Sequence, residues 1–336
     1  MNLKTIAEKA GVSTATVSNV INGNYHKVSQ KTILKVQKII EDNEYEPSAA
    51  ARSLASKKSR IIGVVVPNLG PDDDFFVNPY NAHMLALLES YIRNQGYYMM
   101  MRCVGQCREI IPLFASWNVD GIIFFGTFRD EVEDIRGKLK VPTVFIDTYA
   151  EDLGVANVGI DDYKGGYLAA RYLLGRGHRE IAFVGPNTES PGVIRQRYLG
   201  FCAACKEKDV EITPEHCFEA YTLYQHGVAS GQKIASSSRD FTAAAVMSDI
   251  VAFGVIEGLR LCGLSVPNDI SVIGFDNLPE CLYSNPKLTT ISQSLPRKAQ
   301  LVGELLFKMI RGEPASAGEM IDVEIIERQS VRNLNE

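Results

Sequence analysis

The chain of 336 residues contains no hydrophobic run long enough to cross a membrane. Its longest apolar stretches, such as IIGVVV at 61–66, are far shorter than the roughly 20 residues that a spanning helix needs. The opening residues also lack an apolar core, because Lys4, Glu8 and Lys9 interrupt them, so no export signal is expected. These absences argue against a membrane protein or an exported receptor and predict a cytoplasmic protein.

Motifs of common enzyme and metal sites are also missing. The chain has no GxGxxG that opens a helix after a strand and no GxxxxGK, and its five histidines do not pair at metal-ligand spacing. Seven cysteines, an odd number, fit reduced thiols. Cys202 and Cys205 have CxxC spacing but lie in a helical pattern without a second pair, so packing is favoured over zinc or redox use. We expect no catalytic residue, no metal, no cofactor and no enzymatic activity.

Positive charge is scarce in most of the chain and concentrated at its beginning. The whole chain carries −5, whereas residues 1–60 hold ten Lys and Arg against five Asp and Glu, a net of +5 that leaves −10 for the remainder. Hydrophobic residues at 46% and charged residues at 22% are ordinary for a soluble globular protein. A basic head on an acidic body predicts an anionic partner for the head alone.

The basic head has the pattern of short amphipathic helices. Ile6, Ala7 and Ala10 form one helical face that Gly11 ends, and Ser13 is a natural N-cap for a second helix. The inward side of the second helix holds Val17, Val20 and Ile21. Its opposite side holds the small or uncharged residues Thr14, Ala15, Ser18, Asn19 and Asn22. Such short side chains allow a helix to approach base edges in the major groove.

A third helix follows, capped by Ser29 and closed by Pro47. Its inner face holds Ile33, Val36 and Ile40, and another face holds Lys31, Lys35 and Lys38. Three short helices with a glycine turn between the first two predict a helix-turn-helix. A small bundle with a merely solvated face is the alternative, which the segregated positive charge disfavours.

Four stretches resemble the lactose/galactose repressor (LacI/GalR) family. The first is the headpiece, LKTIAEKAGVSTATVSNVINGN at 3–24 continued by VSQKTILKVQKIIEDNEYEPSAAARSLASKKSRIIGVVVP at 28–67. The others are GHREIAFVGP at 177–186, VPNDISVIGFDN at 266–277 and LTTISQ at 288–293, so the resemblance covers nearly the whole chain. It implies a sequence-specific transcriptional regulator, a repressor by family habit with an activator as the alternative. A homodimer on a palindromic double-stranded DNA operator is expected. No heptad tail follows Glu327, so we expect no tetramer.

The resemblance also assigns contacts with DNA. Thr14, Ala15 and Asn19 would touch bases, whereas Thr16, Ser18 and Asn22 would hold phosphates. Residues 48–56, SAAARSLAS, are good helix formers but too few for a stable helix alone. They correspond to the family's hinge helix, whose Leu54 would wedge into the minor groove, with an ordinary linker as the alternative. The predicted DNA-binding set is Thr5, Ser13, Thr14, Ala15, Thr16, Ser18, Asn19, Asn22, Ala51, Leu54 and Ala55.

Residues 61–336 alternate short apolar strands with helix-length segments, which predicts an α/β fold with doubly wound parallel sheets. The strands fall into two sets, so we expect two Rossmann-like subdomains, and the resemblance implies the periplasmic-binding-protein type I arrangement. The predicted domains are a helix-turn-helix headpiece at 1–47, a hinge helix and linker at 48–60, and an effector-binding and dimerisation domain at 61–336. The first subdomain would span about 61–160 and 293–321, and the second about 161–292 and 322–336.

Polar residues near the ends of these strands form a candidate ligand site, because ligands of doubly wound sheets bind beyond the carboxyl ends of strands. Carboxylates and a forked guanidinium suit the paired hydroxyls of a sugar or the edge of a base. The resemblance supports Arg197 and Asp276 most strongly, whereas each acid taken singly has a surface or capping role as its alternative. The predicted effector-binding residues are Tyr80, Thr127, Asp147, Asp161, Arg197, Ser248 and Asp276.

Two departures from the family pattern leave the effector open. Ser248-Asp249 stands where Asn-Asp is usual, and the first loop, NLGPDDDFFVNPYNAHM at 68–84, is longer and more acidic. We expect a sugar or sugar derivative, with a nucleoside or purine co-repressor as the alternative; the sign of its effect on DNA binding stays open. A receptor without DNA function would not carry a basic helix-turn-helix. Trp117, just before a strand, is expected in the core.

Overall fold

The computed structural model describes residues 2–21, 23–43, 45, 58–67, 75–186, 189 and 192–336. The chain divides into two compact units, Met1–Arg60 and Ile61–Glu336. Four predicted DNA-binding residues lie outside the described residues: Asn22, Ala51, Leu54 and Ala55. Within the described ranges, no helix combines the length and the apolar character that crossing a membrane requires.

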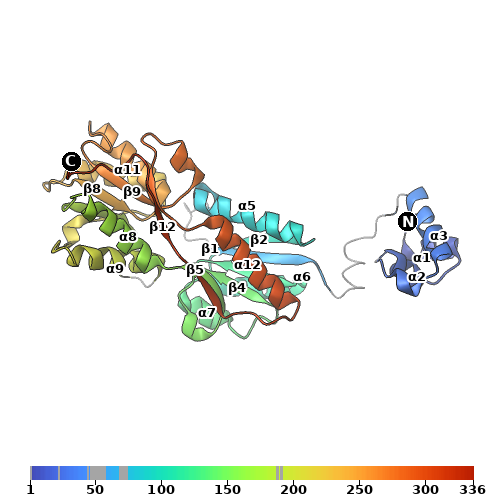
Figure 1. The fold of residues 1–336 in the computed structure, drawn as a ribbon. Helices are drawn as coiled ribbons and strands as arrows, with labels where there is room; N and C mark the ends of the chain where they lie inside the picture. The colour runs from blue at the N-terminus through green and yellow to red at the C-terminus, as the bar shows by residue number, and fades with distance from the viewer. Residues whose placement is uncertain are drawn as a thin grey trace. The chain divides into compact units, whose positions relative to one another are not determined.

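The first unit is a bundle of helices around one apolar core (Figure 1). Its elements are α1 (Leu3–Ala10), α2 (Thr14–Ile21), the 3-10 turn η1 (Tyr25–Lys27) and α3 (Gln30–Asp42). Gly11, with a φ of 65°, ends α1 in the left-handed conformation that glycine adopts most readily. The Ser13 and Ser29 hydroxyls accept backbone N–H groups three residues on, at 3.1 and 3.4 Å, as N-caps do. The predicted helix-turn-helix is confirmed.

The second unit contains two six-stranded sheets. The first sheet has the order β11-β5-β4-β3-β1-β2, and its paired strands are parallel. Its strands are β1 (Ile61–Pro67), β2 (Tyr98–Val104), β3 (Gly121–Phe125), β4 (Thr143–Ile146), β5 (Ala156–Ile160) and β11 (Gly318–Ile321). Helices α5 (Pro79–Asn94) and α12 (Leu295–Ile310) cover one face, and α6 (Ile110–Trp117) and α7 (Arg129–Ile135) cover the other (Figure 1). We call this sheet and its helices the first subdomain.

The second subdomain is built on the sheet β12-β10-β9-β8-β6-β7. Its strands are β6 (Ile181–Gly185), β7 (Cys217–Glu219), β8 (Ala243–Val246), β9 (Ser271–Asp276), β10 (Thr289–Ser292) and β12 (Glu324–Ile326). Only β12 pairs antiparallel among the described strands. Helices α8 (Asp162–Gly175) and α9 (Val193–Lys206) cover one face, and α10 (Tyr224–Ala235) and α11 (Asp249–Leu261) the other. Two doubly wound α/β layers confirm the predicted fold class.

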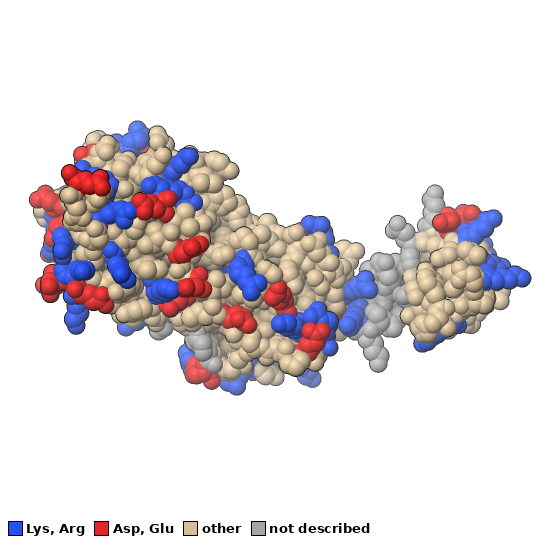
Figure 2. All heavy atoms as spheres, viewed as in Figure 1, with Lys and Arg blue, Asp and Glu red and all other residues tan. Residues whose placement is uncertain are grey.

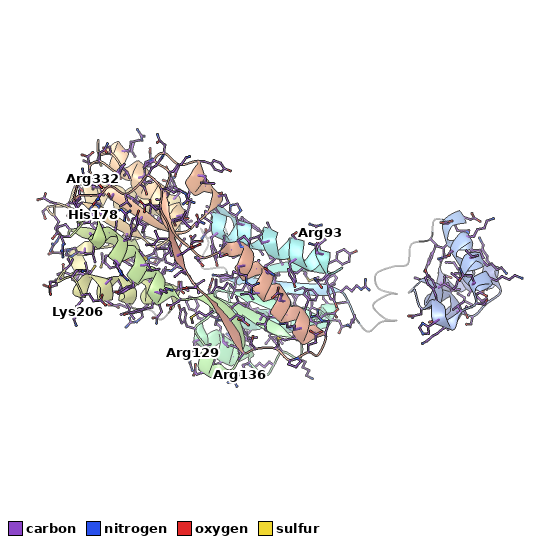
Figure 3. All side chains as sticks on the ribbon, in the orientation of Figure 1. Arg93, Arg129, Arg136, His178, Lys206 and Arg332 are labelled. Carbon is purple, nitrogen blue, oxygen red and sulfur yellow. The ribbon has the colours of Figure 1, made fainter. Side chains whose placement is uncertain are left out.

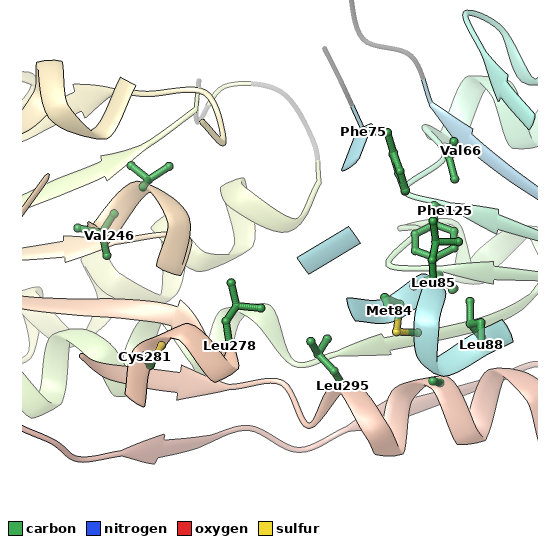
Figure 4. Close-up of a cluster of buried hydrophobic side chains, with 14 of the residues drawn as sticks. Val66, Phe75, Met84, Leu85, Leu88, Phe125, Val246, Leu278, Cys281 and Leu295 are labelled. Carbon is green, nitrogen blue, oxygen red and sulfur yellow. The ribbon is translucent and has the colours of Figure 1, made fainter. Parts of the chain in front are cut away.

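The chain passes three times between the two sheets: from β5 into α8, from β10 into α12, and from β11 into β12. One buried apolar cluster extends through both subdomains. In Figure 4, Leu278 and Leu295 lie between Val246 on one side and Phe125 on the other. This continuity places the carboxyl ends of the strands of both sheets near the three crossings.

The prediction that Trp117 lies in the core is wrong. Its side chain is 54% exposed, whereas Ile110 and Phe114 of the same helix are buried. The Phe114 ring fills the space over β1, where even a Cβ atom on Gly63 would come within 2.4 Å of it. Trp117 is the last residue of α6, and the chain turns away at Asn118, whose φ is 50°. The tryptophan therefore lies outside the core.

Candidate DNA-binding helix and ligand site

Helix α2 presents small, uncharged side chains to solvent. Thr14 and Ala15 are exposed, Ser18 and Asn19 are half-buried, and Val17 on the opposite side is fully buried against α1 and α3. None of the three head helices carries an acidic residue in its first turn. A helix with this outer surface can approach DNA closely without repelling phosphates.

Side-chain hydrogen bonds within the head involve Thr5, Ser13 and Thr16 of the predicted DNA-binding set. The Ser13 hydroxyl accepts the Thr16 backbone N–H at 3.1 Å and lies 2.9 Å from the Thr16 hydroxyl. The Thr5 hydroxyl donates to Asn2 Oδ1 at 3.0 Å. These bonds fix the starts of α1 and α2, so the three residues position the helices whether or not they also touch DNA. Lys31, Lys35 and Lys38 are exposed on α3 and supply positive charge.

In the second unit, Arg197 of α9 is held in a buried position at the ends of the strands. Its Nε donates to Asp162 Oδ1 at 2.8 Å, and its Nη1 donates to the Met247 carbonyl at 2.7 Å. Its guanidinium carbon lies 3.6 Å from the centre of the Phe275 ring. An ion pair, a backbone acceptor and an aromatic face therefore fix the guanidinium before any ligand arrives.

Asp162, the partner of Arg197, is shared between two donors. Its second oxygen, Oδ2, accepts the Tyr149 hydroxyl at 2.6 Å. Burial raises the pKa of Asp162, and the nearby Arg197 opposes that rise. Burial and the same carboxylate raise the pKa of Tyr149, so its hydroxyl stays a donor. The arrangement connects the loop after β4 in the first subdomain with α8 and α9 in the second.

Asp147 follows β4 and points toward α12. Its backbone has a φ of 54°, a left-handed conformation that is uncommon for residues other than glycine. Lys298 Nζ lies 2.8 and 2.9 Å from its two carboxylate oxygens, and the Tyr80 hydroxyl donates to Oδ2 at 2.7 Å. Lys298 itself is fully buried. Burial, followed by the charge of Asp147, raises the pKa of Tyr80.

Lys298 also connects to the second subdomain through hydrogen bonds. Lys298 Nζ donates to Gln293 Oε1 at 2.7 Å, and Gln293 Nε2 donates to Asp276 Oδ1 at 2.5 Å. Burial raises the pKa of Asp276, and the neighbouring Asp249 raises it further. Hydrogen bonds from Lys298 to Asp147 and to Gln293, and from Gln293 to Asp276, therefore link the two subdomains. We call this set the strand-end cluster: Tyr80, Asp147, Asp162, Arg197, Asp276, Gln293 and Lys298.

The other predicted effector residues lie apart from these hydrogen bonds. Thr127 is buried after β3, with its hydroxyl 3.9 Å from Cys107 Sγ. Ser248 is the N-cap residue of α11, but its side chain makes no capping bond. Asp161 accepts the Lys164 backbone N–H at 2.8 Å and so caps α8. In this structure Asp161 therefore acts as a helix cap, the alternative role expected for a single acid near a strand end.

Sequence reasoning missed Lys298, Gln293, Asp162 and Tyr149 as site residues. A signal existed for Lys298, because it interrupts the apolar face of α12 that Leu295, Val302 and Leu306 form. Gln293 and Asp162 follow strand ends, as the predicted acids do.

A cavity of about 260 Å³ opens beside the strand-end cluster. Its lining includes Asp147, Tyr149 and Asp162 together with residues along β5 and β11. Within the described residues, no group of three His, Cys, Asp or Glu side chains is placed to hold a metal ion. The side chains of the strand-end cluster offer hydrogen bonds and charges to a ligand.

Comparison with known proteins identifies both units. The model of bacterial regulatory proteins of the lacI family matches residues 2–48, and that of a periplasmic binding protein-like domain matches residues 170–331. The HTH-type transcriptional regulator MalR of Clostridium butyricum is 32% identical over 99% of this chain and 100% of its own length. The HTH-type transcriptional repressor PurR of Vibrio vulnificus is 32% identical over 99% of each chain.

Solved structures show the same fold over both units. The Lac repressor dimer bound to operator and the anti-inducer ONPF has a TM-score of 0.87 at 24% identity and covers 99% of both chains. A LacI family transcriptional regulator from Enterococcus faecium with bound ribose has a TM-score of 0.70 at 27% identity. It matches 82% of this chain and 99% of its own.

Proposed function

The chain belongs to the lacI family of bacterial regulatory proteins, and on that premise we propose that it is a DNA-binding transcriptional repressor whose operator affinity is switched by a sugar or sugar derivative. The effector would bind between the two subdomains, at the strand-end cluster. The regulator would act in the cytoplasm as a homodimer on a palindromic operator. Helix α2 would read bases through Thr14, Ala15 and Asn19, with Ser18 and Thr16 on phosphates.

The strand-end cluster is the observation that carries the proposal. Tyr80, Asp147 and Lys298 come from the first subdomain, whereas Arg197 and Asp276 come from the second. A ligand changes a conformational equilibrium only if it binds one arrangement better than the other. A molecule that replaces hydrogen bonds between these two groups meets that condition, because its contacts depend on how far the subdomains are closed.

A sugar is favoured over a base as the effector. The Enterococcus faecium relative, 27% identical, has bound ribose. The guanidinium of Arg197 already covers the Phe275 ring, so that aromatic face is not open for stacking a base. A nucleoside or purine co-repressor is the alternative, and it would need another aromatic surface.

The assignment of 48–60 as a hinge is also a proposal, supported by the sequence alone. If Leu54 wedges between base pairs, Leu54→Ala should weaken operator binding and reduce DNA bending while effector binding stays unchanged. Equal bending and equal affinity in the variant would restore the linker interpretation.

Two measurements test the proposed function together. Selection from random DNA should return a symmetric motif, and a thermal-shift screen of sugars, nucleosides and phosphorylated sugars should find a compound that raises the melting temperature. That compound should then change operator affinity in a binding titration. An asymmetric motif, or no compound that alters DNA binding, would contradict the proposal.

A further inference from the structure

The guanidinium of Arg197 keeps hydrogen-bond donors available although it is buried. On the visible face of residues 61–336, Lys and Arg side chains lie among Asp and Glu side chains (Figure 2), whereas only 6% of Arg197 is exposed. Its Nε–H and one N–H of Nη1 are donated to Asp162 and to the Met247 carbonyl. A guanidinium has five N–H groups, so three remain for a ligand when the described residues are counted. How well these three meet a ligand depends on what holds the other two.

The main chain of Arg197 is fixed by close contact between two helices. Helix α9 lies so near α8 that a Cβ atom on Gly166 would come within 1.8 Å of the Arg197 carbonyl oxygen. The same helix α8 carries Asp162 in its first turn, and Asp162 is also buried. The main chains of Arg197 and Asp162 therefore keep a constant separation. The freedom that remains lies in the two side chains, which meet at 2.8 Å.

The side chain of Asp162 is oriented from the other subdomain. Its Oδ1 accepts the guanidinium, and its Oδ2 accepts the Tyr149 hydroxyl at 2.6 Å. Tyr149 follows β4 in the first subdomain, whereas Asp162 begins α8 in the second. A carboxylate that accepts on both oxygens cannot rotate freely, because hydrogen bonds weaken steeply when their angles change. Tyr149 therefore fixes the carboxylate that Arg197 meets.

The same hydroxyl helps to keep Asp162 charged. Burial raises the pKa of Asp162, and the charge of Asp147 raises it as well. The charge of Arg197 and the hydrogen bond from Tyr149 both oppose this rise. Loss of the hydroxyl would move the pKa of Asp162 further upward and so weaken its ion pair with Arg197.

The loop that carries Tyr149 is anchored on both sides of that residue. Thr148 is buried, and its N–H donates to Asn157 Oδ1 at 3.2 Å. Further along the loop, Asp152 accepts hydrogen bonds at 2.5 and 2.6 Å from Arg129 of α7, which is labelled in Figure 3. A loop held in this way presents the phenol at a fixed place, so little conformational entropy is lost when it bonds to the carboxylate.

We propose that Tyr149 is a positioning residue, which reaches from the first subdomain to Asp162 and so holds the Arg197 guanidinium in the orientation that binds the effector. The inference rests on the proposed function and adds a residue that acts through Asp162 and not through contact with the ligand. Tyr149→Phe tests it, because phenylalanine keeps the half-buried ring and removes only the donor to Asp162 Oδ2. The fold should therefore be kept.

Tyr167 offers a matched control for this substitution. Its hydroxyl donates to Glu207 Oε2 at 2.7 Å, so the two groups are the same and the distance is similar. Both residues belong to the second subdomain, and this exposed hydrogen bond lies at the carboxyl end of α9, where Figure 3 labels Lys206. Tyr167→Phe therefore removes the same kind of hydrogen bond away from Arg197.

The first measurement needs no ligand. In the full-length protein with arginine labelled by the heavy nitrogen isotope, the Nε–H of Arg197 gives an NMR signal, which Arg197→Lys assigns by its loss. Hydrogen exchange of this proton reports how often the guanidinium leaves Asp162. Tyr149→Phe should raise the exchange rate at least about ten-fold, the change expected when a hydrogen bond to a charged group is lost. Tyr167→Phe should leave the rate unchanged.

The second measurement is ligand affinity. Ribose, glucose and cellobiose are titrated into the full-length protein by calorimetry. For each sugar that wild type binds, Tyr149→Phe should weaken binding about ten-fold, because the guanidinium is no longer held in place. Tyr167→Phe should change the affinity by less than about two-fold, as a surface substitution does.

The outcomes separate this inference from the proposed function. Equal exchange of the Arg197 Nε–H in wild type and in Tyr149→Phe would overturn the inference, whether or not a sugar binds. An unchanged affinity of Tyr149→Phe for every sugar that binds, or an equal loss in Tyr167→Phe, would also overturn it. If no compound changes operator affinity and no symmetric DNA motif is selected, the proposed function fails, while the exchange rates still decide whether Tyr149 positions Arg197.

Discussion

The fully buried Lys298 and the partly buried Asp147 form an ion pair between residues 151 positions apart in the chain. Both carboxylate oxygens lie within 2.9 Å of the ammonium. The pair depends on the left-handed backbone at Asp147, because a strand-like φ would send this side chain in another direction. Its position between Tyr80 and Gln293 makes it the link between the first subdomain and Asp276.

Replacing one partner of this pair should destabilise the second unit strongly. Lys298→Met leaves the partly buried Asp147 carboxylate without a counter-charge. Loss of one partner of a fully buried pair costs about 3–5 kcal/mol of unfolding free energy, and the exposed part of Asp147 makes a cost near the lower end the expected result. Urea unfolding of the full-length protein measures the change. Lys164→Met, at the exposed pair with Asp322, is the control and should have little effect. If Lys298→Met were as harmless as the control, the pair would not be buried as described.

Arg197 should be required for the response to effector but not for DNA binding. Arg197→Ala removes the donor to Asp162 and to the Met247 carbonyl, so an effector held by this guanidinium should lose affinity by about 1.5–3 kcal/mol, the value of a hydrogen bond to a charged group. Arg197→Lys should bind the effector little better than Arg197→Ala does, since an ammonium cannot form the paired hydrogen bonds of a guanidinium or stack on the Phe275 ring. Operator affinity with and without the identified effector is the measurement. A variant that responds at the wild-type ligand concentration would place the effector elsewhere.

The buried carboxyl of Asp276 should make stability fall as pH rises. Burial raises its pKa in the folded state above the unfolded value of about 3.9, so the folded state holds the proton more tightly. Its contribution is fully present below about pH 4 and is lost progressively as pH rises toward the folded-state pKa. Asp276→Asn should remove this part of the pH dependence, as measured by unfolding free energy at several pH values.

Asp269 serves as a control, because the fold lowers its pKa whereas it raises the pKa of Asp276. Hydrogen bonds from Ser265 lower its pKa, so its contribution is present at neutral pH and lost as pH falls. Asp269→Asn should therefore change stability only toward acid pH, and by little, because this carboxylate is exposed. If Asp276→Asn, like Asp269→Asn, changed stability only toward acid pH, Asp276 would not hold a proton more tightly in the folded state than in the unfolded state.

Two substitutions in the head should separate base reading from phosphate binding. Asn19→Ala on α2 should change the preferred operator sequence, whereas Lys31→Ala on α3 should weaken binding to all sequences alike and reduce the salt slope by about 1. Binding titrations on the selected motif and its single-base variants, at several salt concentrations, measure both effects. Uniform weakening by Asn19→Ala would remove its role in base recognition.

Much of the fold was readable from local patterns. The spacing of Ile6, Ala7 and Ala10, the caps Ser13 and Ser29, and the continuous apolar strands predicted the helix-turn-helix and the two parallel sheets. These features depend on periods of 3.6 and 2 residues and on turn chemistry, which neighbouring residues carry. The DNA contacts and the effector role of Arg197 and Asp276 remain predictions.

The sequence by itself determined the secondary structure, the uneven charge and the presence of polar residues at strand ends, because each is a property of neighbouring residues. Only the tertiary structure decided that Asp161 caps a helix while Asp162 pairs with Arg197, that Lys298 reaches Asp147, and that Trp117 stays outside the core. Such pairings join residues far apart in the chain. They depend on backbone angles at single positions, such as the φ of 54° at Asp147, and on side chains that already occupy the nearest space, as Phe114 does over Gly63.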